Sequence, residues 1–307
     1  MFLELATQQV DVSGLTPLQY RRQTDTPFFR THYQKFRYPS FGYTYLGYNL
    51  RDPKFADRRV RQAINDAVNK DELIAGVLLG LGRVSTGPFP PESWAYNAAV
   101  KPAPYDPAKA KALLAEAGWT DTDGDGWLDR QGRSFSFTLL TNQGNEERLK
   151  AAEIIQRRLK EVGIRVEIRV VEWSAFLSQF IDPHQFEAVL LGWGLSRDPD
   201  LFDLFHSSKT KRGEFNFVSY KNEEVDRLLV EGRRTFDQRQ RTAIYHRIHQ
   251  LIAEDQPYLF LYVPEALPVV HARVRNVVAS PIGIGYNLID WYVSKAAQRY
   301  TRWRLDP

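Results

Sequence analysis

One segment has the residue types and spacing of a calcium-binding loop. In DTDGDGWLD, residues 121–129, aspartates occupy positions 1, 3 and 5 of such a loop and a glycine stands at its sharp turn. The predicted ligands are Asp121, Asp123, Asp125, the carbonyl of Trp127, and Asp129 at position 9. Position 12, which needs a bidentate glutamate, is Gly132, and the expected flanking elements are a helix and a strand. Two interpretations follow: a structural calcium ion, or a solvated turn that needs no metal.

A second candidate segment is LLGWGLSRDPDLFDLF, residues 190–205. An apolar strand is expected to end at Trp193 and to continue into a loop that holds Arg197 and Asp198. Loops at the carboxyl ends of parallel strands are where α/β proteins bind ligands. The alternative is that Trp193 only caps the core and that a helix begins at the Asp-Pro pair. The segment is therefore a candidate ligand-binding loop.

No arrangement of residues typical of an enzyme is found. His246 and His249 lie three residues apart on one expected helix, and without a third ligand we expect a helix-surface pair rather than a metal site. No serine occupies a G-x-S-x-G turn, and no glycine-rich phosphate-binding loop occurs. The absence of cysteine excludes thiolate chemistry and Cys-based metal sites. We expect no catalysis and no required cofactor, with calcium as a structural ion at most.

The composition is that of a folded globular chain. The 307 residues include 41 Lys+Arg and 37 Asp+Glu, so the net charge is 41 − 37 = +4, and 43% of residues are hydrophobic. These values exclude a disordered chain, a coiled coil and a collagen-like repeat. The basic residues at 147–169 and 233–247 are interpreted as solvated faces, so we expect no nucleic-acid partner. The longest apolar stretch, 73–81, is too short to span a bilayer, and the N-terminus lacks the pattern of a signal peptide.

The elements expected around these segments alternate between strand and helix. Alternating or continuous apolar residues predict strands at 43–50, 134–141, 164–170, 186–193 and 258–263. Apolar residues at helical spacing predict helices at 60–68, 73–78, 106–117, 146–162 and 173–180, and helical structure from 222 to 254. The strand–helix–strand order predicts parallel pairing, and the apolar run at 186–193 predicts a strand buried on both faces. The sequence thus predicts an α/β fold.

Several of these stretches resemble one known family. YLGYNLRDPKFADRRVRQAINDAVNKDELI (45–74), YDPAKAKALLAEAGW (105–119), GWGLSRDPD (192–200), FNFVSYKNEEVDRLL (215–229) and DQPYLFLY (255–262) occur in the order found in the family 5 extracellular solute-binding proteins. These are the oligopeptide- and dipeptide-binding receptors of ABC importers. The resemblance is strong from about residue 40 to 275 and weak before it. It covers the C-terminal portion of such a receptor.

The resemblance implies a two-lobed periplasmic-binding-protein-like fold of type II. Residues 1–50 resemble the last part of the N-terminal lobe, residues 51–258 the inserted α/β lobe, and residues 259–307 the segment that returns to the first lobe. The start of the usual chain, including its export signal, is absent, so Met1 is expected to begin a truncated gene product. The location implied is extracytoplasmic, in the periplasm or at the cell surface.

The resemblance also implies a set of ligand-binding residues. Trp193 and Trp173 match aromatic residues that line the cleft, and Tyr45 and Tyr262 match tyrosines near the hinge. The position of an aspartate that pairs with the peptide's amino group is Ser196 here, which supplies no charge. Asp198 is the expected substitute, with Arg197 beside it as a neutralising group.

The function implied is reversible solute binding without covalent chemistry. The expected solute is an oligopeptide or another small molecule held in an aromatic-walled cleft. The expected partners are the membrane subunits of an ABC importer, and the chain is expected to be a monomer. Two alternatives are a ligand-sensing domain of the same fold in a regulator and a truncated remnant that binds no solute.

Overall fold

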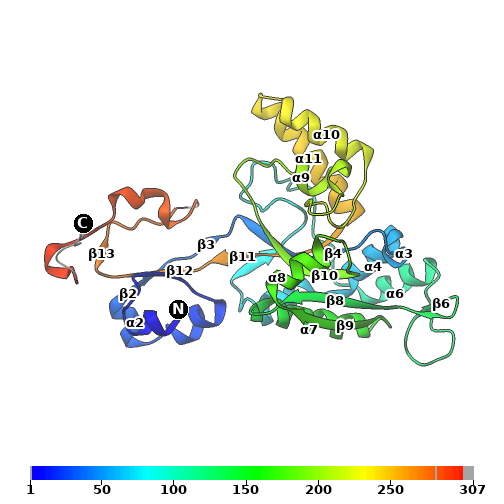
Figure 1. The fold of residues 1–307 in the computed structure, drawn as a ribbon, viewed down its shortest axis with the longest axis horizontal. Helices are drawn as coiled ribbons and strands as arrows, with labels where there is room; N and C mark the ends of the chain where they lie inside the picture. Colours follow the sequence, from blue (N-terminus) through cyan, green and yellow to red (C-terminus); the bar gives the residue numbers. More distant parts are fainter. Residues whose placement is uncertain (1, 281, 300–307) are drawn as a thin grey trace. The chain divides into compact units, whose positions relative to one another are not determined.

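The computed structural model of the chain describes residues 2–280 and 282–299. Its contacts divide the chain into two compact units (Figure 1). Unit 1 comprises residues 1–40 and 265–307, and unit 2 comprises residues 41–264. The domain boundaries expected from the sequence, 50/51 and 258/259, both fall inside unit 2. The reason is that the strands at 42–48 and 258–264 pair with each other in the sheet of unit 2.

Unit 2 alternates strands and helices along most of its length. Its strands are β4 (Gly42–Tyr48), β5 (Gly82–Val84), β6 (Asp129–Arg130), β7 (Arg133–Ser134), β8 (Ser136–Asn142), β9 (Arg165–Val171), β10 (Ala188–Gly194) and β11 (Tyr258–Ala266), whose last two residues belong to unit 1. Its helices are α3 (Pro53–Ala56), α4 (Arg58–Ala67), α5 (Lys70–Gly76), α6 (Pro107–Glu116), α7 (Glu146–Lys160), α8 (Trp173–Ala175), η2 (Phe176–Ile181), α9 (Phe202–Phe205), η3 (Ser207–Lys209), α10 (Glu223–Arg234) and α11 (Gln238–Asp255).

The main sheet of unit 2 has the order β11–β4–β10–β8–β9, with β5 paired to β11. β8 pairs in parallel with both β9 and β10, as the strand–helix–strand order predicts. β4 is antiparallel to β10 and to β11, so it lies between two strands from much later in the chain. The α/β prediction is therefore correct, and the sheet is mixed.

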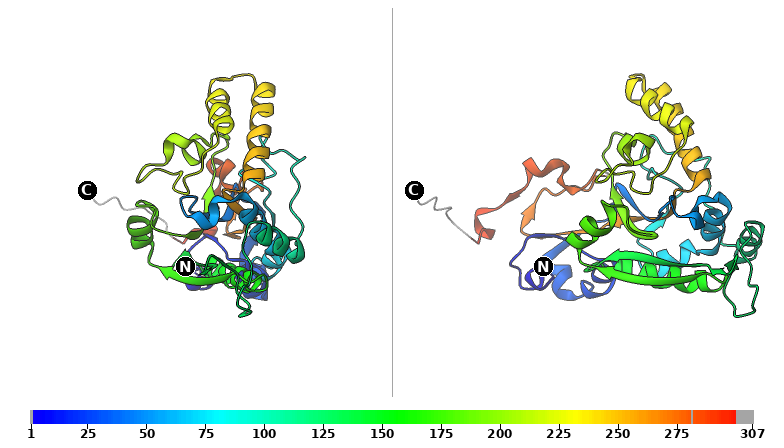
Figure 2. Two further views of the ribbon diagram at one scale, coloured as in Figure 1. Left: turned by 90° about the vertical axis from the view of Figure 1, so that its right-hand side faces the viewer. Right: turned by 45° about the vertical axis from the view of Figure 1, so that its right-hand side comes forward.

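Helices cover both faces of this sheet (Figures 1 and 2). On one face Leu46 and Leu190 lie in a core cluster with buried residues of α4, α6 and α7. On the other face Tyr45 and Val189 lie in a cluster with buried residues of α10 and α11. Since neighbouring residues of one strand point to opposite faces, both β4 and β10 are central strands. This confirms that the run at 186–193 is buried on both faces.

The α10–α11 hairpin places one predicted surface residue in the interior. The two helices pack side by side (Figure 2), and Asp237 caps α11 by accepting a hydrogen bond from the Gln240 amide, 2.8 Å. His249 is completely buried, so the expectation of a helix-surface histidine pair is wrong. Its Nδ1 accepts from the Asn97 amide at 3.0 Å, and its Nε2 lies 3.2 Å from the Thr86 hydroxyl. The loop that follows β5 covers this histidine, which periodicity along α11 alone does not reveal.

Unit 1 is built from both ends of the chain and has small cores of its own. Its elements are α1 (Phe2–Ala6), β1 (Val12–Gly14), η1 (Gln19–Gln23), α2 (Pro27–His32), β2 (Tyr33–Lys35), β3 (Tyr38–Pro39), β12 (Pro268–His271), β13 (Val274–Arg275), η4 (Ile284–Asp290), β14 (Tyr292–Val293) and η5 (Lys295–Ala297). β12 lies between β1 and β2, antiparallel to both. A core of Leu5, Phe29, Tyr33 and Val269 joins the two chain ends.

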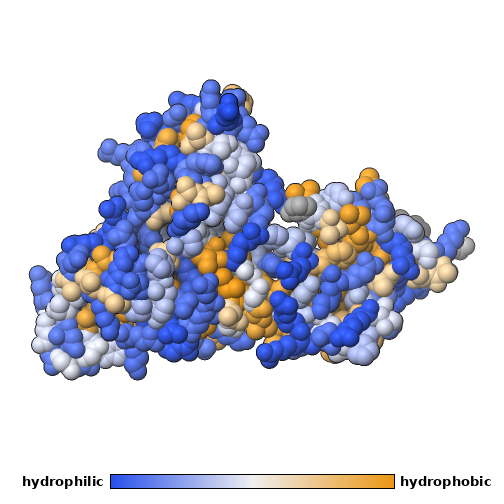
Figure 3. All heavy atoms as spheres, turned by 180° about the vertical axis from the view of Figure 1, so that it is seen from behind, coloured by the Kyte–Doolittle hydropathy of each residue, from blue (hydrophilic) through white to orange (hydrophobic). Residues whose placement is uncertain are grey.

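The surface of the described residues is mainly hydrophilic. On the face drawn in Figure 3, hydrophobic side chains form separate groups among polar ones. None of the helices in the described ranges combines the length and the apolar character needed to cross a membrane.

Candidate ligand-binding site

The carboxyl ends of three neighbouring strands form one edge of the sheet in unit 2. β8 ends at Asn142, β9 at Val171 and β10 at Gly194, and because the three strands are parallel these ends meet at the same edge. Helices α7 and α8 begin a few residues after β8 and β9. This edge, here called the ligand edge, is the place where α/β sheets bind ligands.

Trp193 stands at the ligand edge, partly exposed and held by other aromatic rings. Its ring is stacked with Tyr45 at a centroid distance of 6.2 Å, and it meets Phe215 edge-on at 5.8 Å. Its indole N–H donates to the Tyr258 hydroxyl at 3.4 Å, and Tyr258 is itself stacked on Tyr45 at 4.1 Å. Stacked and edge-on contacts of this kind fix the orientation of a ring. The indole of Trp193 thus presents a fixed apolar surface.

Trp173 belongs to the same edge through β9, which ends two residues before it. Its side chain is 46% exposed and stacked on Phe176 at 5.8 Å. The Glu172 carboxylate caps α8 by accepting from the Ser174 and Ala175 amides, which fixes the position at which Trp173 leaves the sheet. Both tryptophans predicted from the sequence therefore come from the carboxyl ends of strands in one sheet.

Tyr45 and Tyr262 lie in the core instead of at the surface. They are 0% and 2% exposed, and burial raises the pKa of Tyr45 well above its ordinary value and that of Tyr262 to about 12. Tyr45 supports Trp193 from β4, while Tyr262 lies in the core cluster packed under α7. This differs from the expectation that both side chains contact a solute. In this structure Tyr45 contacts the Trp193 ring, and Tyr262 is a core residue.

An arginine of α11 neutralises the acidic residue Asp198 in the loop after β10. Asp198 accepts two hydrogen bonds from the Arg241 guanidinium, at 2.8 and 2.9 Å, and this pairing lowers the pKa of Asp198. Arg197, expected to be the neutralising partner, instead places its guanidinium 4.2 Å above the centre of the Phe41 ring. The Ser196 hydroxyl donates to the Asp198 carbonyl at 2.6 Å. The loop therefore offers a solute no uncompensated carboxylate at either position, 196 or 198.

Two charged residues at the ligand edge were missed from the sequence. The Arg148 guanidinium donates to Asn142 Oδ1 at 2.6 Å, and a Cβ placed on Gly192 would come within 3.4 Å of Arg148 Nη2. Burial lowers the pKa of Arg148 and raises that of neighbouring Glu147. Among residues 2–280 and 282–299, neither side chain forms an ion pair.

The position of Glu147 and Arg148 at the ligand edge could be inferred from the sequence. The charged residues follow directly on the end of a predicted strand and begin the next helix, capped by Asn145, whose side chain accepts from the Arg148 amide at 2.9 Å. The sequence pattern predicts that the basic residues from 147 onward form a solvated face. That interpretation is wrong for Arg148, because the helix starts at the ligand edge and its first turn faces the sheet.

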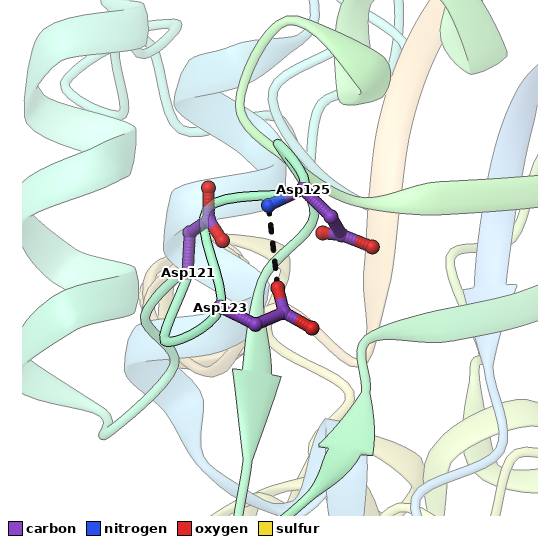
Figure 4. A group of neighbouring side chains, drawn as sticks. All are labelled: Asp121, Asp123 and Asp125. Carbon is purple, nitrogen blue, oxygen red and sulfur yellow. Dashed lines mark hydrogen bonds between the residues drawn. The ribbon is translucent and has the colours of Figure 1, made fainter.

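The acidic loop brings three of its predicted ligands together (Figure 4). Oxygen atoms of Asp121, Asp123 and Asp125 all lie within 4.8 Å of one another. Each carboxylate accepts a backbone N–H of the loop, such as Asp125 N to Asp123 Oδ1 at 3.2 Å. Asp129 lies outside this group, because its carboxylate accepts from the amide and hydroxyl of Thr122, at 2.9 and 2.7 Å. The ring of Trp127 faces Arg165 at 4.6 Å.

A family model and individual known proteins both match this chain. Residues 1–215 match the model of the bacterial extracellular solute-binding proteins, family 5, middle region, so the match includes the first 40 residues, where the resemblance was weak. The chain is 42% identical over 259 residues to the oligopeptide-binding protein AppA of Bacillus subtilis, and 31% identical over 252 residues to the dipeptide-binding protein of Escherichia coli. These alignments cover 83% and 80% of the chain but only 48% and 44% of those proteins.

A solved structure agrees with these matches. The structure of Bacillus subtilis AppA in complex with a nonapeptide superimposes with a TM-score of 0.86 at 38% sequence identity, covering 95% of this chain and 58% of that one. The chain spans about half the length of the curated relatives it matches. The family match extends over more than two thirds of the chain, and the α/β fold is in keeping with it. The chain therefore belongs to the family 5 bacterial extracellular solute-binding proteins.

Proposed function

We propose that the chain is the C-terminal part of the substrate-binding component of a peptide-type ABC importer. It would bind its solute reversibly, outside the cytoplasm, and deliver it to the membrane subunits of the importer without covalent chemistry. Family membership and the 42% identity to an oligopeptide-binding protein support this proposal. The observation that carries it is that one sheet edge holds both the partly exposed indole of Trp193 and the guanidinium of Arg148, which forms no ion pair with the described residues.

The guanidinium of Arg148 favours recognition of a carboxylate at this edge, and burial raises the pKa of neighbouring Glu147, which disfavours its charged form. Arg148 has used one donor on Asn142, and its burial makes a further charge-assisted hydrogen bond stronger than it would be in water. Asp198 is already satisfied by Arg241, so the loop after β10 lacks a free partner for a peptide's amino group. We therefore expect Arg148 to bind a carboxylate of the peptide while an apolar side chain packs on Trp193. Trp173 would extend the same apolar surface.

A structural calcium ion in the acidic loop is a separate part of the proposal. The three clustered carboxylates of Asp121, Asp123 and Asp125 support it, because like charges this close repel one another unless a cation is bound. The ion would hold the loop between α6 and β6. It would have no direct role in solute binding. We expect the chain to act as a monomer.

The experiment that tests the proposal combines native mass spectrometry with tryptophan fluorescence. The purified chain is mixed with a pool of tripeptides to pentapeptides, and peptides retained in the complex are identified by their added mass. Peptides found in this way are then titrated while intrinsic fluorescence is recorded. Binding should change the fluorescence, and Trp193→Ala should remove most of that change. A chain that retains no peptide would contradict the proposal.

A separate experiment tests whether Arg148 binds the carboxylate of the peptide. Arg148→Met should weaken binding of a peptide with a free C-terminal carboxylate at least tenfold. Binding of the same peptide with an amidated C-terminus should be almost unchanged, because that peptide has no carboxylate to pair with Arg148 in either the parent or the variant chain. Lys150→Met, an equal change of charge at an exposed position of the same helix, is the control and should have little effect. Equal weakening of the free and amidated peptides by Arg148→Met would show that the arginine does not bind the carboxylate.

A further inference from the structure

A second cavity lies within unit 2, away from the ligand edge. Its volume is about 400 Å³, which falls in the range of small-molecule sites. The start of α5, the loop that follows β5, the end of α11 and strand β11 all contribute to its wall. Trp193, Arg148 and the acidic loop do not line it.

A buried ammonium group faces this cavity. Lys70 is the first residue of α5 and is only 9% exposed, yet no hydrogen bond or ion pair to its Nζ is formed by any residue that the structure describes. Asp66 attracts Lys70 electrostatically but forms no ion pair with it, and the Asp66 carboxylate pairs with Lys109 at 2.8 Å. A charge removed from water without a hydrogen-bonded partner is costly, so such a group in a cavity wall indicates a ligand that binds there.

Two amide side chains in the same wall are also unsatisfied. Asn65 is 4% exposed and forms no side-chain hydrogen bond with the described residues. The side-chain amide of Gln256 also forms no hydrogen bond with the described residues, so its NH₂ group is an unused donor and its Oε1 is a buried, unpaired acceptor. Gln256 is held in place by its backbone, since its amide donates to the Ile252 carbonyl at 2.9 Å and its carbonyl accepts from Arg61 at 3.1 Å. Three polar side chains thus converge on one cavity with hydrogen-bonding capacity that the chain leaves unused.

The charge and shape of the cavity define the class of ligand. Lys70 supplies up to three donors, and each amide can present its NH₂ group, whereas a carboxylate accepts up to four hydrogen bonds. Phe260, Val100 and Ala253 give the remaining wall an apolar character. The one acidic side chain of the lining, Glu254, is exposed and accepts a hydrogen bond from Gln250 at 2.8 Å. The wall therefore suits an anionic head group attached to a short apolar body.

We propose that this cavity is a second binding site, specific for a small organic acid whose carboxylate pairs with Lys70 and is hydrogen-bonded by Asn65 and Gln256. Burial lowers the pKa of Lys70 to about 8, so the amine is still mostly protonated at pH 7 and gains a full partner when the acid binds. The site is independent of the proposed peptide function, because its lining shares no residue with the ligand edge.

The test uses hexanoate, hexylamine and inorganic phosphate as probes of the full chain. Lysine labelled with ¹³C reports the Lys70 Cε–H resonance, assigned through Lys70→Met, and a pH titration gives its midpoint. Hexanoate should bind saturably and raise that midpoint by at least one pH unit, because the bound carboxylate favours the ammonium form. Hexylamine should not bind. Phosphate binding without hexanoate binding, or no shift of Lys70 with any probe, would overturn the proposal.

Three variants separate binding from folding. Lys70→Met should reduce hexanoate affinity at least tenfold and leave the melting temperature unchanged or higher, because it removes an unpaired buried charge. Gln256→Glu keeps the side-chain size but places a negative charge in the wall of the same cavity, and it should also abolish hexanoate binding. Lys111→Met, at an exposed position of α6, is the control for loss of one positive charge. If Lys70→Met lowers the melting temperature and leaves hexanoate affinity intact, the lysine is structural and the proposal is wrong.

Discussion

His249 shows how burial determines the chemistry of a single side chain. It is fully enclosed between α11 and the loop after β5, and burial lowers its pKa from 6.5 to about 4. Asn97 N–H donates to Nδ1, so the neutral ring carries its proton on Nε2 and donates it to Thr86. A protonated ring would lose the bond from Asn97, because Nδ1 would no longer be an acceptor. The folded chain therefore requires the neutral form.

The stability of the chain should depend on pH through this residue. Above pH 6.5 both folded and unfolded chains hold a neutral His249, and it has no effect on the pH dependence. As the pH falls from 6.5 to 4, His249 becomes protonated in the unfolded chain but stays neutral in the folded chain. The free energy of unfolding therefore falls by up to about 3 kcal/mol. Urea unfolding of the chain and of His249→Gln at pH 7.5, 5.5 and 4.5 checks this. The variant should lose less stability than the parent between pH 7.5 and 4.5, and equal losses would contradict the assignment.

The pairing of β4 with β10 depends on a glycine of β4 at the ligand edge. Gly42 lies opposite Gly194, and a Cβ on Gly42 would come within 2.2 Å of the Trp193 carbonyl oxygen, whereas a Cβ on Gly194 would meet nothing within 4 Å. Gly42→Ala should therefore force the two strands apart beside Trp193 and destabilise the fold by about 1–3 kcal/mol. Gly194→Ala should change stability by less than about 0.5 kcal/mol. Urea unfolding measures both, and similar losses for the two variants would show that the close approach is not decisive.

The loop between α6 and β6 gives a prediction for metal binding. Three acceptor groups already gather there, so adding calcium should raise the melting temperature and Asp123→Ala should abolish the rise. Asp129 accepts hydrogen bonds from Thr122 and lies outside the cluster, so Asp129→Asn should keep most of the calcium response. Thermal unfolding with 5 mM calcium or with chelator tests this. An equal melting temperature in both conditions would favour the solvated turn.

The strands and helices of unit 2 were predictable because their signals are local. The continuous apolar run that ends at Trp193 predicted β10, and the alternating residues from Ile164 to Val170 predicted β9. The unit boundaries were not predictable, because they depend on β4 pairing with strands that begin about 140 and 210 residues later. The same difference between local and long-range signals decides which residues of the candidate ligand-binding site could be predicted. Aromatic positions were found from motifs, whereas the Asp198–Arg241 pair joins residues 43 positions apart.

The division of the molecule into two units has a consequence for unfolding. The large core clusters lie within unit 2, and the clusters around Tyr33 and Val270 lie within unit 1. Because the cores are separate, we expect two unfolding steps, with unit 1 melting first since its cores are small. Calorimetry should give a measured enthalpy larger than the van't Hoff enthalpy. A fragment of residues 41–264 should fold alone and keep the higher transition, and an unfolded fragment would contradict this division.

The way the chain enters and leaves unit 2 also determines how that unit responds to mechanical force. β4 and β11 are antiparallel, with Thr44 opposite Tyr262, so the chain ends at Phe41 and Pro264 lie at the same end of one strand pair. Tension on these two ends would break the interstrand hydrogen bonds one at a time, whereas tension between Phe41 and Gln256, a partly exposed residue just before β11, would load them together. The chain has no cysteine, so single thiols can be placed at these positions as attachment points for optical tweezers. The first pair of handles should open the sheet at much lower force, beginning at the strands that support the ligand edge.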